Sequence, residues 1–185
     1  MKYLTAGESH GKGLVAILEG IPAGLTVRKE DISREMQRRM SGYGRGGRMK
    51  IETDEVEIYA GLRGGVTLGS PIAFVLNNRD YANWQPYTDP FDGDRTARRL
   101  TAIRPGHADY AGCVKYHTAD ARNILERASA RQTAMRVAVG AVCKRYLAEL
   151  GVTVASHVTE IAGVTSAYEP KTAEELAAAD ADPVR

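Results

Sequence analysis

The sequence predicts an α+β fold, with strand-forming and helix-forming segments interleaved irregularly rather than in repeating βαβ units. Short apolar or alternating segments, closed by glycine or proline, occupy residues 14–27 and 49–76, which is typical of antiparallel strands. An apolar stripe with helical spacing follows over residues 129–150. No GxGxxG motif follows a predicted strand, so nothing indicates a dinucleotide-binding Rossmann fold.

The composition is that of a globular protein of ordinary domain size. The 185 residues are 43% hydrophobic and 26% charged. The N-terminus lacks an apolar segment of signal-peptide length, and no run reaches the roughly 18 apolar residues of a membrane span. We therefore expect a cytoplasmic protein with no membrane partner. Cys113 and Cys143 have no metal-site spacing, so we expect no bound metal and treat both as buried apolar side chains.

The first elements are two strands and a helix. The apolar run at 14–18 predicts a buried strand that ends at a Gly/Pro turn, and residues 25–27 extend a second strand. Asp31 is a plausible N-cap for a helix that continues to about Met40, where the glycine-rich segment SGYGRGGR ends it.

The middle of the chain has β character followed by a loop. The alternation in KIETDEVEIY and the compact apolar run at 72–76 predict an antiparallel meander. Residues 79–99 show little periodicity and predict a long loop, which Trp84 would anchor.

The strongest local prediction is a core helix that begins at Ser129. Ser129 and Gln132 have capping-box spacing, and Gly151 supplies the C-terminal stop. One apolar stripe at spacings of three, four and seven consists of Ala128, Met135, Val139, Val142, Tyr146 and Leu150. Strand-like residues 152–164 follow, and a second capping box at Thr172–Glu175 opens a helix in the acidic tail.

Positive charge is concentrated in one segment. Residues 28–50 carry eight Lys/Arg against three Asp/Glu, although the whole chain has a net charge of only +2. A basic cluster in a nearly neutral protein indicates a defined anionic ligand. Guanidinium groups suit phosphate or carboxylate, and the candidates are Arg38, Arg39, Arg45 and Arg48. A solvated basic loop, or an RGG-like segment that binds RNA, remains the alternative.

Two histidines have local sequences that suit chemistry. His10 lies in GESHG, where the flanking glycines leave the imidazole accessible, and histidine is the natural proton donor near neutral pH. His107 lies in RPGHAD, at the expected start of a helix. The alternative for His10 is a turn residue hydrogen-bonded to the backbone, and the alternative for His107 is a helix-capping histidine. His117 and His157 are interpreted as structural.

The segment before the core helix could hold a phosphate. In ERASARQT, free backbone N–H groups at the helix start lie beside a serine hydroxyl and two arginines. Ser129 acting only as a helix cap is the commoner meaning of this pattern.

Together these segments resemble the chorismate synthase family. The matching segments, in family order, are GESHGKGLVAILEGIPAG, RRMSGYGRGGRM, NNRD, RPGHADYAG and ERASARQTAMRVAVGAV, and the resemblance covers residues 1 to about 165. It implies an α+β sandwich with helices between antiparallel sheets, and a homotetramer. It also implies a carbon–oxygen lyase of the shikimate pathway to aromatic amino acids. This enzyme forms chorismate from 5-enolpyruvylshikimate 3-phosphate by anti-1,4-elimination of phosphate, with reduced FMN and no net redox change.

The resemblance also implies roles for particular residues. His10 would protonate the departing phosphate, and His107 would lie against the reduced flavin. Arg39 and Arg45 would contact NADP, which reduces the flavin in some members, and Arg39 and Arg48 would face the substrate. The FMN-binding segment would be Arg127, Ala128 and Ser129.

Family members have a later half, with further flavin contacts, that this chain lacks. We therefore expect residues 1–185 to be the N-terminal portion of a single domain without its C-terminal half, and inactive by itself. One alternative is a flavoprotein oxidoreductase, which would consume NADPH stoichiometrically. The other is a nucleic-acid-binding module using the Arg/Gly loop, but the excess charge is confined to one loop with few aromatic residues, which argues against it.

Overall fold

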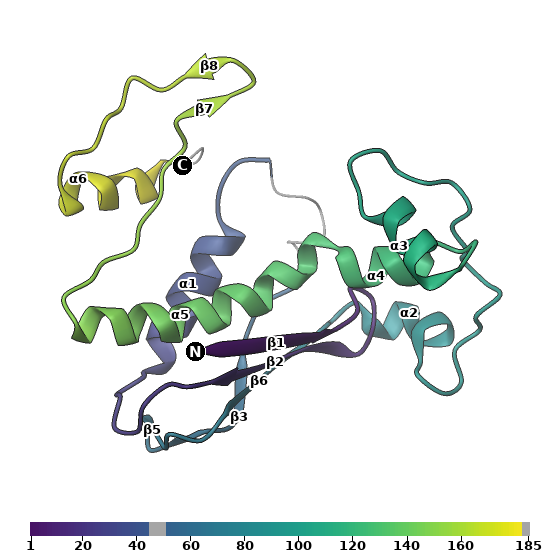
Figure 1. The fold of residues 1–185 in the computed structure, drawn as a ribbon, viewed down its shortest axis with the longest axis horizontal. Helices are drawn as coiled ribbons and strands as arrows, with labels where there is room; N and C mark the ends of the chain where they lie inside the picture. The colour runs from purple at the N-terminus through teal and green to yellow at the C-terminus, as the bar shows by residue number, and fades with distance from the viewer. Residues whose placement is uncertain (45–50, 183–185) are drawn as a thin grey trace.

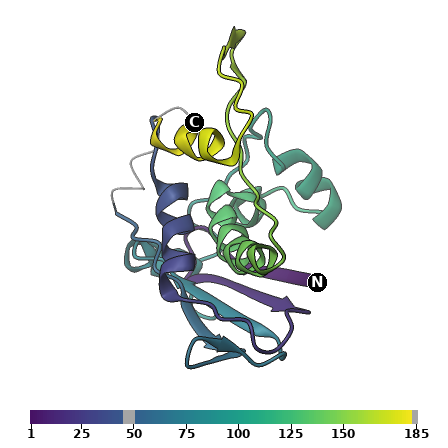
Figure 2. The ribbon, with the colours of Figure 1, turned by 90° about the vertical axis from the view of Figure 1, so that its left-hand side faces the viewer.

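A four-stranded antiparallel sheet and two long helices form the body of the protein. The computed structural model describes residues 1–44 and 51–182. The strands, in sheet order, are β1 (Lys2–Gly7), β2 (Gly13–Glu19), β6 (Ile72–Asn77) and β3 (Glu57–Ala60). Helices α1 (Lys29–Met40) and α5 (Thr133–Glu149) cover one face of the sheet (Figures 1 and 2). The α+β prediction is confirmed.

The core lies between the sheet and these helices because the strands alternate. In β2, Leu14 and Leu18 are buried, whereas Val15 and Ile17 are 40% and 42% exposed on the opposite face. The antiparallel register pairs Leu14 with Leu76, so both side chains lie on the helix side. The largest fully buried core side chains are Leu14, Leu18, Met36, Ile72, Phe74, Leu76, Met135 and Val142.

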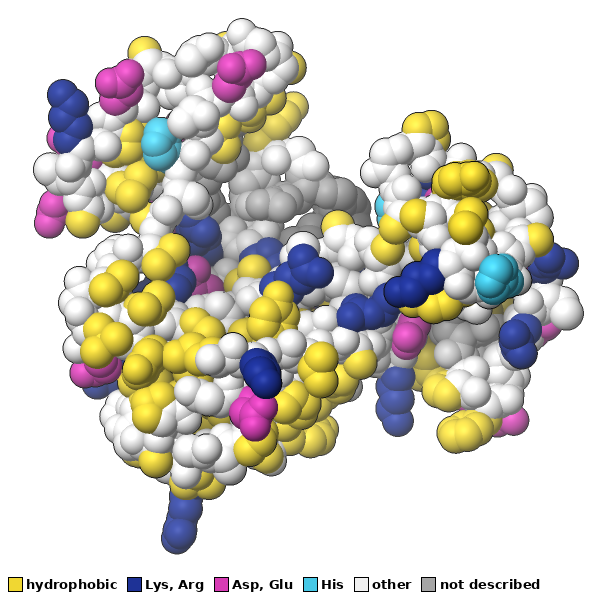
Figure 3. Space-filling view, in the orientation of Figure 1, with side chains coloured by type: hydrophobic (Ala, Val, Ile, Leu, Met, Phe, Trp, Pro, Cys, Tyr) yellow, Lys and Arg dark blue, Asp and Glu magenta, His cyan; other side chains and the backbone are white. Residues whose placement is uncertain are grey.

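The opposite sheet face carries exposed apolar side chains. Leu4 is 77% exposed and pairs in register with Ile17. Hydrophobic side chains also reach the surface over α5 and the neighbouring strand in Figure 3. A sheet that is apolar on both faces is typical of a buried element rather than a solvated surface.

The β-rich middle differs from its prediction in detail. Residues 25–27 form no strand, and Thr26 makes only an isolated bridge to Val66. The meander is confirmed in part, as β3, β6 and the short pair β4 (Leu62–Arg63) and β5 (Val66–Thr67). Alternation in KIETDEVEIY gives a strand only from residue 57, because Glu52 and Asp54 turn inward to a buried arginine.

Helix α1 begins before its predicted cap. Arg28 is the N-cap, and the Asp31 carboxylate lies in the first turn, where it accepts a hydrogen bond of 2.8 Å from the Arg28 backbone N–H. The N-cap prediction for Asp31 is therefore wrong by three residues. Asp31 lies inside the first turn of the helix, and its side chain bonds back to the N-cap residue. At α5 the predicted stop is confirmed, because Gly151 adopts φ +71 directly after the helix.

Helix α2 (Tyr81–Thr88) lies within the loop predicted for residues 79–99, so that prediction is wrong for the helix, whereas residues 89–99 form no helix or strand. None of its residues is fully buried, so its sequence carries no apolar stripe, and Pro86 lies inside it. Local bonds support it instead, because Asp80 accepts from the side chains of Asn83 and Trp84. Helices α3 (Asp109–Tyr116) and α4 (Arg122–Ala128) lie at the same end of the body (Figure 1).

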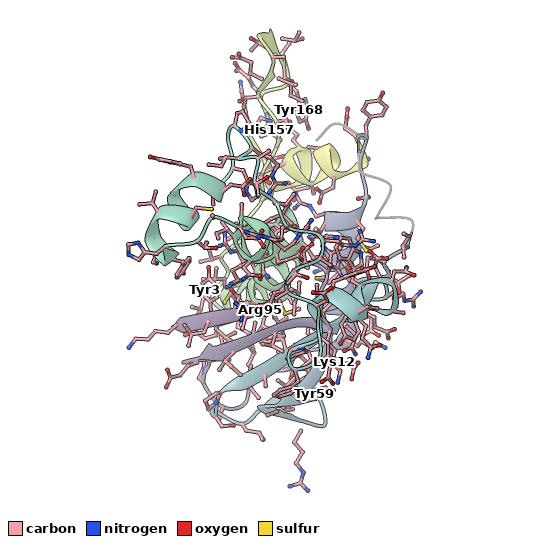
Figure 4. The ribbon with its side chains drawn as sticks, turned by 90° about the vertical axis from the view of Figure 1, so that its right-hand side faces the viewer. Tyr3, Lys12, Tyr59, Arg95, His157 and Tyr168 are labelled. Atoms are coloured by element: carbon pink, nitrogen blue, oxygen red, sulfur yellow. The ribbon has the colours of Figure 1, made fainter. Side chains whose placement is uncertain are left out.

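The C-terminal segment projects from the body (Figure 1). It holds the hairpin of β7 (Glu160–Ile161) and β8 (Val164–Thr165), then α6 (Ala173–Ala178). The capping box at Thr172–Glu175 is confirmed. His157 and Tyr168 pack edge to face at 6.2 Å within this segment (Figure 4). Within the described residues, no helix is long and apolar enough to cross a membrane.

Candidate functional site

His10 lies in the turn between β1 and β2, and Glu126 of α4 holds it. The ring Nδ1 lies 2.9 and 3.0 Å from the two Glu126 carboxylate oxygens, and the His10 backbone N–H donates to Oε2 at 2.8 Å. The backbone N–H of Ser9 also donates to the Glu126 carbonyl. Gly7 enters this turn at φ +109, where an added Cβ would collide with the Gly13 carbonyl. The turn is thus fixed from both sides.

The state of Glu126 decides which imidazole nitrogen is available. Burial alone would raise the pKa of this carboxyl, whose residue is 3% exposed. Hydrogen bonds from the His10 ring and backbone and from Arg122, at 3.3 Å, outweigh burial and hold the pKa below its ordinary value. An ionised carboxylate only accepts, so His10 Nδ1 carries the shared proton. Within the described residues Nε2 has no hydrogen-bond partner, and 19% of the side chain is exposed.

Trp84 packs on the imidazole, and the sequence had suggested only a loop anchor for it. The two rings stack with centroids 4.0 Å apart and planes inclined by 27°. Glu126 likewise had no predicted role, although it is the first residue of the ERASARQT segment. No sequence pattern joins these residues, which lie 42 positions apart, so only the fold brings them to His10.

His107 belongs to a second cluster at the start of α3, as predicted for a histidine before a helix. Its Nδ1 lies 2.5 Å from Asp109 Oδ1, and Arg104 Nε donates to Oδ2 at 2.9 Å. The Asp109 side chain is fully buried, and Arg104 foremost, then His107, holds its pKa well below the usual range. The His107 ring is 23% exposed. It is therefore oriented by a buried anion while remaining accessible.

The predicted arginine cluster does not converge on one point within the described residues. Arg39 donates from Nη1 to Asp54 at 2.7 Å and from Nε to Thr133 at 3.1 Å, which fixes it against the start of α5. Arg38 instead pairs with Asp180 at 2.7 Å. The other two candidates, at positions 45 and 48, lie outside the described residues.

A buried polar network joins Arg39 to the turn that carries His10. Arg131, only 6% exposed, pairs with Asp54 on the other carboxylate oxygen and donates from Nε to Asn78 Oδ1 at 3.0 Å. Asn78 in turn donates to the Gly11 carbonyl at 2.8 Å. Arg131 is one of the two arginines of ERASARQT that were predicted to help hold a phosphate, but it lies buried between Glu52 and Asp54 instead. Asn78 had no predicted role.

The predicted FMN segment forms the junction between α4 and α5. Ser129 caps a short 3₁₀ turn, Ala130–Gln132, and its hydroxyl accepts from the Arg131 N–H at 3.3 Å. Ser129 is therefore an N-cap as predicted, but the capping box is wrong, since Gln132 donates to the Gly7 carbonyl instead. Arg127 donates to the Thr5 carbonyl at 2.6 Å. The buried Gln132 Oε1 has no partner among the described residues.

Comparison with known proteins decides the family. A chorismate synthase family model matches residues 1–184. The chain belongs to the chorismate synthase family. It is 51% identical to the chorismate synthase of Alkaliphilus metalliredigens (strain QYMF) and 55% identical to that of Geobacillus kaustophilus (strain HTA426), over 100% of this chain in both cases. The chain spans about half the length of these relatives, 48% and 49% respectively.

A solved structure supports the same family. A crystal structure of chorismate synthase is 47% identical in sequence, with a TM-score of 0.65 over 85% of this chain and 37% of that chain. The resemblance drawn from the sequence segments is thereby confirmed.

In this chorismate synthase family member, the fold brings some predicted residues together and separates others. The His10 turn contacts Glu126 and Arg39 contacts Ala130, so both lie against the α4–α5 junction that contains residues 127–129. His107 is held in its own cluster with Arg104 and Asp109. Among the described residues, no group of three or more His, Cys, Asp or Glu could hold a metal ion. Cys113 and Cys143 are free thiols, only partly buried, where full burial was expected.

Proposed function

We propose that this chain is the N-terminal half of a chorismate synthase, a lyase that removes phosphate from 5-enolpyruvylshikimate 3-phosphate to give chorismate. The observation that supports this best is the His10–Glu126 pair, an oriented proton donor in a chain of this family. The homotetramer, the cytoplasmic location and the absence of nucleic-acid or membrane partners stay predictions.

His10 is the proposed proton donor to the departing phosphate. Glu126 holds Nδ1, so the second nitrogen, Nε2, is the one that can face a ligand and release a proton to a phosphate oxygen. A positioned donor of this kind typically accelerates a reaction about 10²- to 10⁴-fold. The ionised Glu126 carboxylate accepts from Nδ1 and so fixes the orientation of the ring for this step.

His107 and the α4–α5 junction are the proposed flavin contacts. Reduced FMN, when bound, supplies electron density transiently to the reaction and recovers it. Arg127 offers a guanidinium to a phosphate, and Ala128 and Ser129 supply the turn. Gln132 Oε1, a buried acceptor with no partner among the described residues, would suit an N–H donor of the flavin, so the segment fits such a group. His107, kept in place by the Asp109 anion, would hold or exchange a proton beside the flavin.

The arginines are the proposed anion contacts. Arg39 and Arg48 would face the anionic groups of the substrate, and Arg39 and Arg45 would contact NADPH where that cofactor reduces the flavin. Arg39 would act from a fixed position, because Asp54 and Thr133 already hold its guanidinium. The Arg39 side chain is 13% exposed.

The test is phosphate release from 5-enolpyruvylshikimate 3-phosphate by the full-length protein, under strict anaerobiosis with reduced FMN. We expect His10→Ala to lower turnover at least about 10²-fold while the protein stays folded. The control is His117→Asn, at an exposed left-handed position that ends α3 (φ 51), which asparagine tolerates. Equal turnover with oxidised flavin, or near-normal turnover of His10→Ala, would contradict the proposal. Stoichiometric NADPH consumption with a reduced product would favour an oxidoreductase instead.

A further inference from the structure

Trp84 is the only tryptophan in the chain, and its indole lies against the proposed proton donor. The stacked rings, 4.0 Å between centroids, cover one face of the His10 imidazole. Glu126 restrains the same ring in a different way, because it holds one nitrogen at the ring edge. A hydrogen bond at one nitrogen leaves the ring free to swing about that bond, whereas a stacked face removes this freedom.

Helix α2 holds Trp84 firmly against the turn. The indole Nε1–H donates to Asp80 Oδ2 at 3.1 Å, one helical turn earlier. Thr88, one turn later, has its hydroxyl 2.9 Å from the His10 carbonyl, to which it donates, so the helix is fastened to the residue on which its tryptophan stacks. This helix has no fully buried residue, so core packing does not explain its position.

Arginines from two other segments pack on the same indole. The Arg98 guanidinium lies 4.5 Å from the ring centroids of both Trp84 and Tyr87, and that of Arg122 lies 5.6 Å from Trp84. Arg98 adopts a left-handed backbone, φ 52, which costs a non-glycine residue energy that its contacts must offset. Arg122 donates from Nε to the Arg98 carbonyl at 2.7 Å. The tryptophan is therefore restrained by its own helix and by three other segments of the chain, which carry His10, Arg98 and Arg122.

We propose that Trp84 is a positioning residue for proton transfer by His10. Its indole face fixes the plane of the imidazole, so that Glu126 and Trp84 together leave Nε2 in one orientation for the substrate. This inference rests on the proton-donor role proposed for His10. It predicts that Trp84 affects the rate of the chemical step rather than substrate affinity, because among the described residues it contacts the proposed donor and not Arg39.

The experiment measures kcat and KM of the full-length protein with 5-enolpyruvylshikimate 3-phosphate and reduced FMN. Trp84→Leu keeps an apolar side chain but removes the aromatic face, and we expect kcat to fall about tenfold with KM changed less than about threefold. Trp84→Phe restores an aromatic face and should recover most of kcat. Tyr116→Leu, which removes an exposed ring from α3, is the matched control and should leave kcat unchanged.

A double-variant cycle separates positioning from general loss of structure. In the His10→Ala background the substitution Trp84→Leu should have no further effect on kcat, because there is no imidazole left to position. If Trp84→Leu does not fold, Asp80→Ala replaces it, since that change removes the acceptor that orients the indole, together with the bond from Asn83 to the same carboxylate. It should lower kcat about threefold with His10 present and not in its absence.

The outcomes distinguish this inference from the proposed function. Near-normal turnover of His10→Ala would overturn the proton-donor role itself. A large effect of His10→Ala, with kcat of Trp84→Leu equal to that of the parent protein, would overturn only the role of Trp84. Equal losses from Trp84→Leu in both backgrounds would show that the tryptophan acts on structure alone, which also overturns the inference.

Discussion

Replacing Glu126 by glutamine removes one charge from the site and leaves the side-chain volume unchanged. Glu126 accepts from the His10 backbone at 2.8 Å and from the ring at 2.9 Å, with Arg122 at 3.3 Å. A glutamine keeps one acceptor oxygen and presents an NH₂ group to a second donor. The loss is about one charge-assisted hydrogen bond, so we expect Glu126→Gln to lower the free energy of unfolding by about 1.5–3 kcal/mol at neutral pH.

The effect should depend on pH in a definite direction. The pKa of Glu126 is held below its ordinary value of 4.5, so its carboxylate stabilises the folded state above that value. This stabilisation is lost as the pH falls through the folded-state pKa, where the parent protein also becomes neutral at this position. The difference in unfolding free energy between the parent and Glu126→Gln should therefore become smaller as the pH falls below about 4.5.

The assay is urea denaturation of the full-length protein and of Glu126→Gln, from neutral pH down to about pH 3. Glu149→Gln is the control, because Glu149 pairs with Arg145 on the surface, is 53% exposed, and should contribute less than about 1 kcal/mol. A stability difference for Glu126→Gln that stays constant with pH would refute the assignment of an ionised Glu126. Turnover should also fall, since His10 loses its fixed proton at Nδ1.

Two other predictions concern the buried network and the isolated chain. Arg131→Met should lower the free energy of unfolding by about 3–5 kcal/mol because two buried carboxylates, Glu52 and Asp54, lose their ion pair with it. Lys144→Met removes a cation whose side chain is 37% exposed and should cost under about 1 kcal/mol in the same urea titration. The isolated 185-residue chain should self-associate through its apolar outer sheet face and show no turnover. Size-exclusion chromatography should show Leu4→Lys/Ile17→Lys shifted towards monomer, and a monodisperse, active parent chain would contradict this expectation.

Sequence patterns predicted the parts of the fold that depend on periodic burial. The strand at 14–18 was predicted from a continuous apolar run and the core helix after Ser129 from an apolar repeat, and both are present as β2 and α5. Helix α2 was missed because hydrogen bonds donated by the Asn83 and Trp84 side chains to Asp80 support it, and such bonds leave no periodic pattern in the sequence. The alternation around Glu52 and Asp54 predicted a strand that begins too early. The charged side chains there occupy buried positions, so polar residues do not mark the exposed face.

For the site, the sequence located His10 and His107 in accessible turns, because glycine spacing and residue chemistry are local properties. Their partners were not predictable in the same way. Glu126 lies 116 positions from His10, and Trp84 lies 74 positions from it. A pairing of this kind follows from strand register and helix placement, and only the family resemblance carries that information in a single sequence.

The buried network explains how distant segments keep one geometry. Arg131 pairs with Asp54, which also holds Arg39, and it bonds to Asn78, which holds the turn after His10 through the Gly11 carbonyl. Every link is polar and mostly buried, so a shift of one segment would break a buried ion pair or leave a buried amide without its partner, at a cost of about 1–5 kcal/mol. The arginine proposed to hold the substrate and the histidine proposed to protonate it are therefore fixed relative to each other by the same buried guanidinium.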